Sequence, residues 1–224
     1  MNMIRKFAFA VLAATFGLTG CDILSVRPEE IKLPEKTREM LANKDWYVSS
    51  EIGYYDLTNL MKVGEEANRK KEKVRFTRQF PKLVTPPPAT VAIANMVMKN
   101  FREDMAEKGL NIVKEPCDQC LVVKIDLGHY EGEILKFLFV IPVWQKVTYL
   151  NAKATVLHKN QVLLETDEIV GVLQSKGLLE EKAHQEARAA TATAQYVAEQ
   201  IAAFAKNRPA DFRSVSAEKK TTIQ

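Results

Sequence analysis

The middle of the chain contains short runs in which apolar and polar residues alternate. Residues 121–130 and 145–158 show this period-two pattern, which is typical of a strand with one buried face. A short turn at 159–160 and an apolar run at 161–171 follow, so 145–171 is predicted to be an antiparallel hairpin. Residues 46–55 are rich in aromatic and β-branched side chains and are predicted to form another strand.

Two longer stretches carry the spacing of amphipathic helices instead. The first, 85–109, has three prolines after Thr85 and ends at Gly109, which are typical starting and ending signals for a helix. The second, 179–206, has small residues on one face of its first half and larger apolar residues on that of its second. The positions predicted to be buried are Val91, Ala94, Met98, Phe101 and Met105 in the first helix, and Ala183, Ala187, Ala190, Ala194, Val197, Ile201 and Phe204 in the second.

These elements predict an α+β fold, a small and mainly antiparallel sheet with two amphipathic helices packed on one face. We expect residues 45–206 to form a single domain. Residues 21–44 are expected to act as a flexible tether with one short helix, and the polar segment 207–224 as a disordered tail. The pattern is poor between 56 and 84, apart from a candidate strand at 73–80.

The run "ILKFLFVIPVW", residues 134–144, allows several interpretations. It is either a buried strand that continues into 145–157, or an apolar hairpin tip exposed for a partner protein or a membrane surface. Pro142 breaks a regular central strand and "HYEGE" at 129–133 is typical of a turn, which favours the tip. Lining a cavity for a lipid or small ligand is a further alternative. The candidate contact residues are Ile134, Leu135, Phe137, Leu138, Phe139, Val140, Ile141 and Trp144.

The first twenty residues have the features of a signal peptide. Arg5 and Lys6 precede an almost entirely apolar run at 7–17. This run is too short to cross a hydrocarbon core of roughly 30 Å comfortably. We therefore expect residues 1–20 to be removed and the mature chain to begin at Cys21.

The segment Leu18-Thr19-Gly20-Cys21 resembles the lipobox of bacterial lipoproteins. The resemblance implies diacylglycerol on the Cys21 thiol, cleavage before this residue, and an acyl chain such as palmitate on the new amino terminus. Two or more such chains anchor a protein stably to a membrane. The alternative is an ordinary signal peptide that contains a cysteine. The protein is then expected to face the periplasm from a membrane, with Asp22 slightly favouring the inner membrane and the outer membrane still open.

Charge adds one candidate contact surface. The net charge of +4 falls to +2 when Arg5 and Lys6 leave with the signal peptide, and such a balance gives no argument for nucleic-acid binding. A basic cluster begins at 69 and is a candidate for contact with anionic lipid headgroups. A solvated charged surface is the alternative, because Glu65, Glu66 and Glu72 dilute the basic cluster. The candidates for lipid contact are Arg69, Lys70, Lys71 and Lys73.

The remaining cysteines, Cys117 and Cys120, are predicted to form a disulfide, since an even pair in an oxidising compartment is normally bonded. The alternative is a periplasmic thiol–disulfide redox protein. The pair precedes a predicted strand rather than a helix, and the nearby acidic residues disfavour a reactive thiolate. A zinc site would need two further ligands, and His129 is the only histidine nearby.

No catalytic site, metal site or cofactor is predicted, apart from the lipid on Cys21. The sequence lacks HExxH, GxSxG and glycine-rich phosphate-loop motifs, and its three histidines are scattered. The order of elements in 85–206, with "YLNAKATVLHKNQVLLE" before a long alanine-rich helix, resembles envelope lipoproteins of the ABC-transport auxiliary type. It is also similar to the TolB amino-terminal and curli-secretion lipoprotein class. This resemblance implies a non-catalytic accessory or assembly role with other envelope proteins as partners; it leaves the oligomeric state open.

Overall fold

The structure is a computed structural model that describes residues 35–42, 44–71, 80–138, 140–166, 172–173 and 181–211. The predicted signal peptide, Cys21, Lys73, Phe139 and residues 212–224 of the predicted tail lie outside the described residues. The described helices are α2 (Glu35–Ala42), α3 (Leu60–Lys70), α5 (Pro88–Glu107) and α6 (Lys182–Ala205). The described strands are β1 (Trp46–Asp56), β2 (Ile112–Val113), β3 (Leu121–Leu138), β4 (Ile141–His158), β5 (Gln161–Glu165) and β6 (Val172–Leu173).

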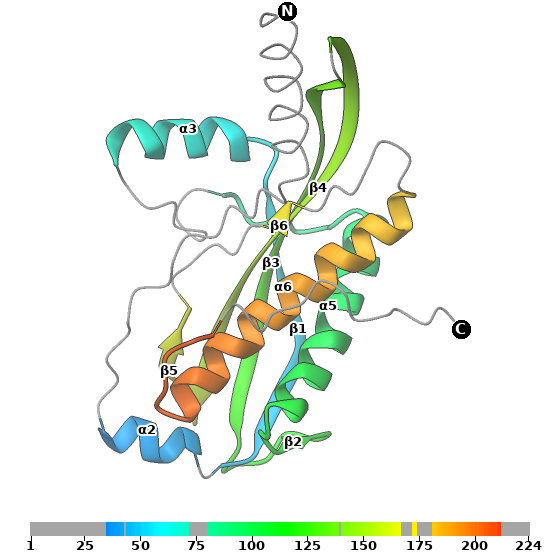
Figure 1. Ribbon diagram of the computed structural model, residues 1–224. Coiled ribbons are helices and arrows are strands. Elements are labelled where there is room, and N and C mark those ends of the chain that lie inside the picture. The colour runs from blue at the N-terminus through cyan, green and yellow to red at the C-terminus, as the bar shows by residue number, and fades with distance from the viewer. Residues whose placement is uncertain are drawn as a thin grey trace, which may run out of the picture.

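The described strands form one sheet in the order β2-β1-β3-β4-β5, with β6 beside β4 (Figure 1). The sheet is mixed, which corrects the expectation of a mainly antiparallel sheet. β1 runs parallel to both β2 and β3, whereas β4 is antiparallel to β3, β5 and β6. The period-two pattern of a strand carries no direction. The crossover through α3 and α5 returns the chain to the end of the sheet where β1 began, so β3 becomes parallel to β1.

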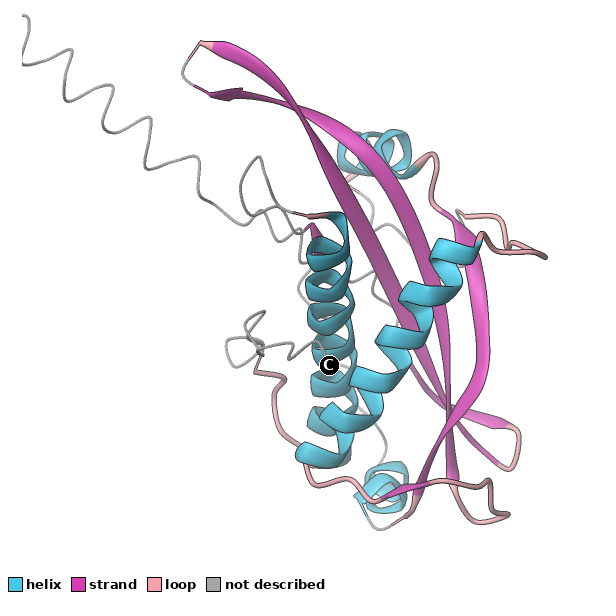
Figure 2. Cartoon of the chain, turned by 90° about the vertical axis from the view of Figure 1, so that its right-hand side faces the viewer, coloured by secondary structure: helices cyan, strands magenta, loops and turns pink. Residues whose placement is uncertain are grey.

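α5 and α6 pack against one another and cover one face of the sheet, as predicted (Figure 2). Pro88 occupies the first turn of α5, where its missing N–H costs no helical hydrogen bond. Gly109 follows the end of the helix with a positive φ of 77°, and the Leu110 amide donates to the Met105 carbonyl oxygen. Small residues on α6 let this helix approach its neighbours closely. Of the α6 residues predicted to be buried, Ala190, Ala194, Val197 and Ile201 are fully buried, whereas Ala183 is exposed and Ala187 and Phe204 are half-buried.

The other face of the sheet carries a smaller cluster beneath α3. Its buried members are Leu57 and Phe80, and Leu60, Val63 and Tyr130 pack against them. Gly128 lies below this cluster, and a Cβ atom there would come within 2.7 Å of the Leu57 side chain. The missing side chain therefore gives the cluster room to lie close to β3. α3 was not predicted, because charged residues dominate its sequence.

The packed body is larger than the predicted domain of 45–206. Leu41 of α2 is fully buried in the main core, although it lies in the segment assigned to the tether. At the other end, the Arg208 side chain and the Asp211 amide both donate hydrogen bonds to Glu199. The described body therefore runs from α2 to Asp211, and the expected tether and tail are both shorter by these residues.

Candidate functional site

The β3–β4 hairpin is much longer than the sequence predicted. Each strand has 18 residues, and their pairing is continuous from Leu121 opposite His158 to Leu138 opposite Ile141. The expected turn at 129–133 is wrong, because these residues lie inside β3. At about 3.3 Å per residue, each strand measures roughly 55 Å from its first to its last Cα atom. The far part of the hairpin extends beyond the helices as a curved two-stranded ribbon (Figures 1 and 2).

The ribbon begins where the neighbouring strands end. The last residue of β3 that pairs with β1 is His129, and β6 pairs with β4 at Tyr149 and Leu150. Among the described strands, none pairs with the outer edges of 130–138 or 141–148. We call these two segments the ribbon. Unpaired edges of this kind expose backbone N–H and C=O groups that another chain can bind.

Apolar side chains are exposed at the end of the ribbon. The exposed fractions are 44% for Leu135, 88% for Val140, 61% for Ile141 and 66% for Trp144. We call these four residues the ribbon tip. Leu135 and Trp144 are opposite one another, whereas Ile141 is opposite Leu138 and so lies on the other face of the ribbon. Each of the two main interpretations of 134–144 is correct in part: the run forms strands that continue into 145–157, but it makes up the end of a hairpin, where most of its described side chains are exposed.

The other candidate contact residues of this run are only partly described. Ile134, Phe137 and Leu138 belong to β3, and their side chains, like the whole of Phe139, lie outside what the structure describes. Pro142 is opposite Phe137 near the end of the ribbon. A residue without an N–H donor is tolerated there because the outer edge of β4 has no described partner strand.

Two polar contacts fasten the base of the ribbon to the starts of both long helices. His129 Nδ1 lies 2.9 Å from the Thr90 hydroxyl of α5. Glu131 forms an ion pair with Lys182 of α6, with 2.9 Å between Nζ and Oε1. Burial lowers the pKa of His129 although Glu131 opposes the shift, so the imidazole is neutral at pH 7. These contacts join the base of the ribbon to the body.

The opposite end of the hairpin carries the cysteine pair. A disulfide joins Cys117 and Cys120, whose Cα atoms are 5.1 Å apart, and the Cys120 amide donates to the Cys117 carbonyl oxygen. Cys120 is buried and Cys117 is exposed. The pair lies directly before β3 and not at the start of a helix, so the helix dipole that activates a redox thiol is missing at this position.

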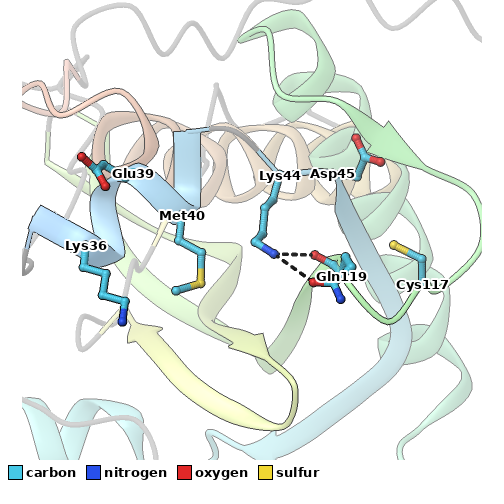
Figure 3. Close-up of a pocket in the computed structure, with 7 residues that line it drawn as sticks. All are labelled: Lys36, Glu39, Met40, Lys44, Asp45, Cys117 and Gln119. Atoms are coloured by element: carbon cyan, nitrogen blue, oxygen red, sulfur yellow. Dashed lines mark hydrogen bonds between the residues drawn. The ribbon is translucent and has the colours of Figure 1, made fainter.

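A shallow pocket of about 610 Å³ lies beside this disulfide (Figure 3). Lys44 reaches across it from the α2–β1 junction, and its Nζ donates to the Gln119 backbone oxygen at 3.3 Å. The same Nζ is 3.2 Å from Nε2 of His158, and burial together with the Lys44 charge lowers the pKa of that imidazole. The lining residues are Lys36, Glu39, Met40, Lys44, Asp45, Cys117 and Gln119. Their charges have mixed sign, so the pocket shows no preference for a ligand of one charge.

The basic cluster predicted for lipid contact lies elsewhere, at the end of α3. Arg69, Lys70 and Lys71 are exposed, and Lys70 forms an ion pair with Glu66 at 2.8 Å. The structure does not bring these residues to the ribbon tip. Their contact with anionic lipid stays a prediction.

Sequence reasoning missed a buried charge cluster at the other end of α6. Glu199 is 1% exposed and accepts hydrogen bonds from Lys108 and Arg208, each at 2.5 Å, and from the Asp211 amide at 2.9 Å. Burial opposes ionisation, but these bonds outweigh it and lower the pKa of Glu199 to about 2. A signal was present, because Glu199 is the only charged residue between 189 and 205.

Comparison with known proteins adds no assignment. The chain matches no protein-family model and no curated protein. None of the helices in the described ranges is long and apolar enough to cross a membrane. Nor does the described part of the chain contain a group of three or more His, Cys, Asp or Glu side chains placed to hold a metal ion.

Proposed function

We propose that this protein is a lipid-anchored, periplasm-facing accessory or assembly subunit of a bacterial envelope complex for transport or secretion, and that it acts without catalysis. Cys21 supplies the anchor, and the inner membrane is slightly favoured by Asp22. The observation that carries the proposal is the exposed ribbon tip.

An exposed apolar tip on a long ribbon has an energetic cost unless something covers it. Fully burying one large aliphatic or aromatic side chain contributes roughly 1.5–3 kcal/mol, so the tip could supply several kcal/mol to an interface. Contiguous apolar groups of this kind commonly mark interaction sites. Tryptophan is also enriched among the residues that dominate binding energy, which makes Trp144 the expected centre of the contact.

The remainder of the molecule suits a scaffold. Two helices, a mixed sheet and the α3 cluster form a body that contacts the base of the ribbon through Thr90 and Lys182. The disulfide lies at the far end of the hairpin from the tip, where it closes a short connection before β3. The redox alternative predicts instead that Cys117 and Cys120 are themselves required for function.

Photo-crosslinking in intact cells tests the contact. A photoreactive amino acid at Val140 is expected to give a discrete protein adduct, whereas the same group at Val162 is not. Val162 is a suitable control because it is 55% exposed and lies on β5, at the other end of β4. Equal adducts at the two positions, or none at Val140, would contradict the proposal.

Membrane fractionation tests the anchor separately. Wild-type protein is expected in the membrane fraction, and Cys21→Ala is expected to lose acylation and membrane attachment. A Cys21→Ala protein that is still processed and acylated would show that the lipobox interpretation is wrong.

A further inference from the structure

The amino-terminal end of the described body and the ribbon tip lie at opposite ends of the molecule. β1 begins directly after α2, and its first residue, Trp46, pairs with Leu121, the first residue of β3. Lys44 contacts both Gln119 and His158 at this same end. Figure 1 shows α2 at the base and the ribbon at the top. The chain that leads to Cys21 therefore joins the body as far from the tip as the hairpin allows.

The length of that chain limits where the tip can reach. Thirteen residues lie between Cys21 and Glu35, and at about 3.3–3.6 Å per step the chain from one to the other spans no more than roughly 50 Å. Measured along β3, the path from Leu121 to Leu138 is roughly 55 Å. If the tip pointed straight into the membrane that holds Cys21, the connecting chain would have to be drawn to its full length. The connecting chain is therefore too short to let the tip enter that membrane in this orientation.

A molecule that lies flat on that membrane would not cover the whole ribbon tip either. Trp144 and Leu135 lie on one face of the ribbon and Ile141 on the other, so a flat contact covers only one side. The charges of the ribbon also balance, with Glu131 and Glu133 against Lys136 and Lys146. Electrostatic attraction to an anionic bilayer is therefore not expected to favour this orientation.

We propose that the ribbon tip inserts into an apolar groove of a different protein, which encloses both faces of the ribbon and lies away from the membrane that holds Cys21. This inference rests on the proposed function and adds the kind of partner and its position. A protein groove can cover Trp144 and Ile141 together, and it can add hydrogen bonds to the unpaired edges of β3 and β4. The chain then bridges its own membrane and a partner surface about one hairpin length away.

Lipid crosslinking separates this partner from the bilayer. The full acylated protein is placed in phosphatidylethanolamine–phosphatidylglycerol vesicles, with a photoreactive group at Val140 or at Val162. We expect severalfold fewer lipid adducts at Val140, because Val162 lies at the end that carries the anchor. As many lipid adducts at Val140 as at Val162 would overturn the inference. A second variant lengthens the chain before Glu35 with a glycine–serine insert. Lipid adducts at Val140 in this variant would show that the native chain length keeps the tip away from the membrane, in support of the inference.

Crosslinking in cells tests the enclosing groove. The Val140 adduct is expected to be a protein of another sequence, and to be lost in both Trp144→Ser and Ile141→Ser, which change opposite faces. Loss in only one of these variants, or an adduct containing two copies of this chain, would contradict the groove. A lipid adduct in cells would overturn only this inference, whereas no adduct of any kind at the tip would count against the proposed function itself. Unchanged thermal unfolding of both variants would show that the body remains folded.

Discussion

Replacing Glu199 with Gln should destabilise the protein and remove part of its response to acid. The carboxylate is buried and binds Lys108, Arg208 and the Asp211 amide. Its pKa falls from 4.5 to about 2. One pKa unit corresponds to 1.36 kcal/mol, so ionised Glu199 contributes up to about 3 kcal/mol to folding. Because both cations are partly exposed, we expect about 2–3 kcal/mol for Glu199→Gln at pH 7.

The sign of the pH dependence follows from the lowered pKa. The stabilisation is complete above the unfolded pKa of 4.5 and is lost as the pH falls toward 2. Urea unfolding followed by circular dichroism should therefore show a large difference between wild type and Glu199→Gln at pH 7, shrinking towards pH 2–3. The matched control is Glu66→Gln, which breaks the exposed pair with Lys70 and should leave the unfolding midpoint nearly unchanged. Equal unfolding midpoints at pH 7, or a difference that does not change with pH, would refute the reasoning.

Three further predictions concern the hairpin. Gly128→Ala should destabilise by about 1–3 kcal/mol in urea unfolding, because its Cβ meets the Leu57 side chain at 2.7 Å, and the cost of Gly128→Ala should be smaller when it is measured in a Leu57→Ala background. Replacing Cys117 and Cys120 with Ser should cost about 2 kcal/mol, as expected for so short a loop, but should leave function in a cell-based complementation assay intact; loss of function in a folded double variant would favour the redox alternative. Trp144→Ser should change stability by less than about 0.5 kcal/mol in thermal unfolding, since the side chain is mostly exposed; a larger loss would mean that the ribbon tip packs on the body.

The sequence predicted the elements whose pattern is imposed by burial. Leu121, Val123, Ile125 and Leu127 alternate because each points into the core beneath α5 and α6, and all are buried. The alternation ends where the core ends, near His129, so the strand seemed to end there too. Beyond this point β4 is the only described strand that pairs with β3, and glycine and acidic residues that suggested a turn are tolerated in an exposed ribbon.

Other features depend on contacts that a linear pattern does not encode. The parallel pairing of β1 with β3 follows from the path of the crossover, not from either strand. The cluster around Glu199 joins α5, α6 and the segment after α6, so its partners are far apart in the sequence. The disulfide was the easier prediction, because Cys117 and Cys120 are the only two cysteines that remain once Cys21 is assigned to the lipid.

Affinity purification of the acylated protein from detergent-solubilised membranes tests the central claim most directly. Wild type is compared with the double variant Leu135→Ser, Trp144→Ser and with the control Val162→Ser, an exposed position at the other end of the hairpin. The account predicts that an envelope protein co-purifies with wild type and the control and is lost from the double variant, while all three remain folded and acylated. Recovery of the same partner with the double variant would contradict the claim that the ribbon tip is the binding site.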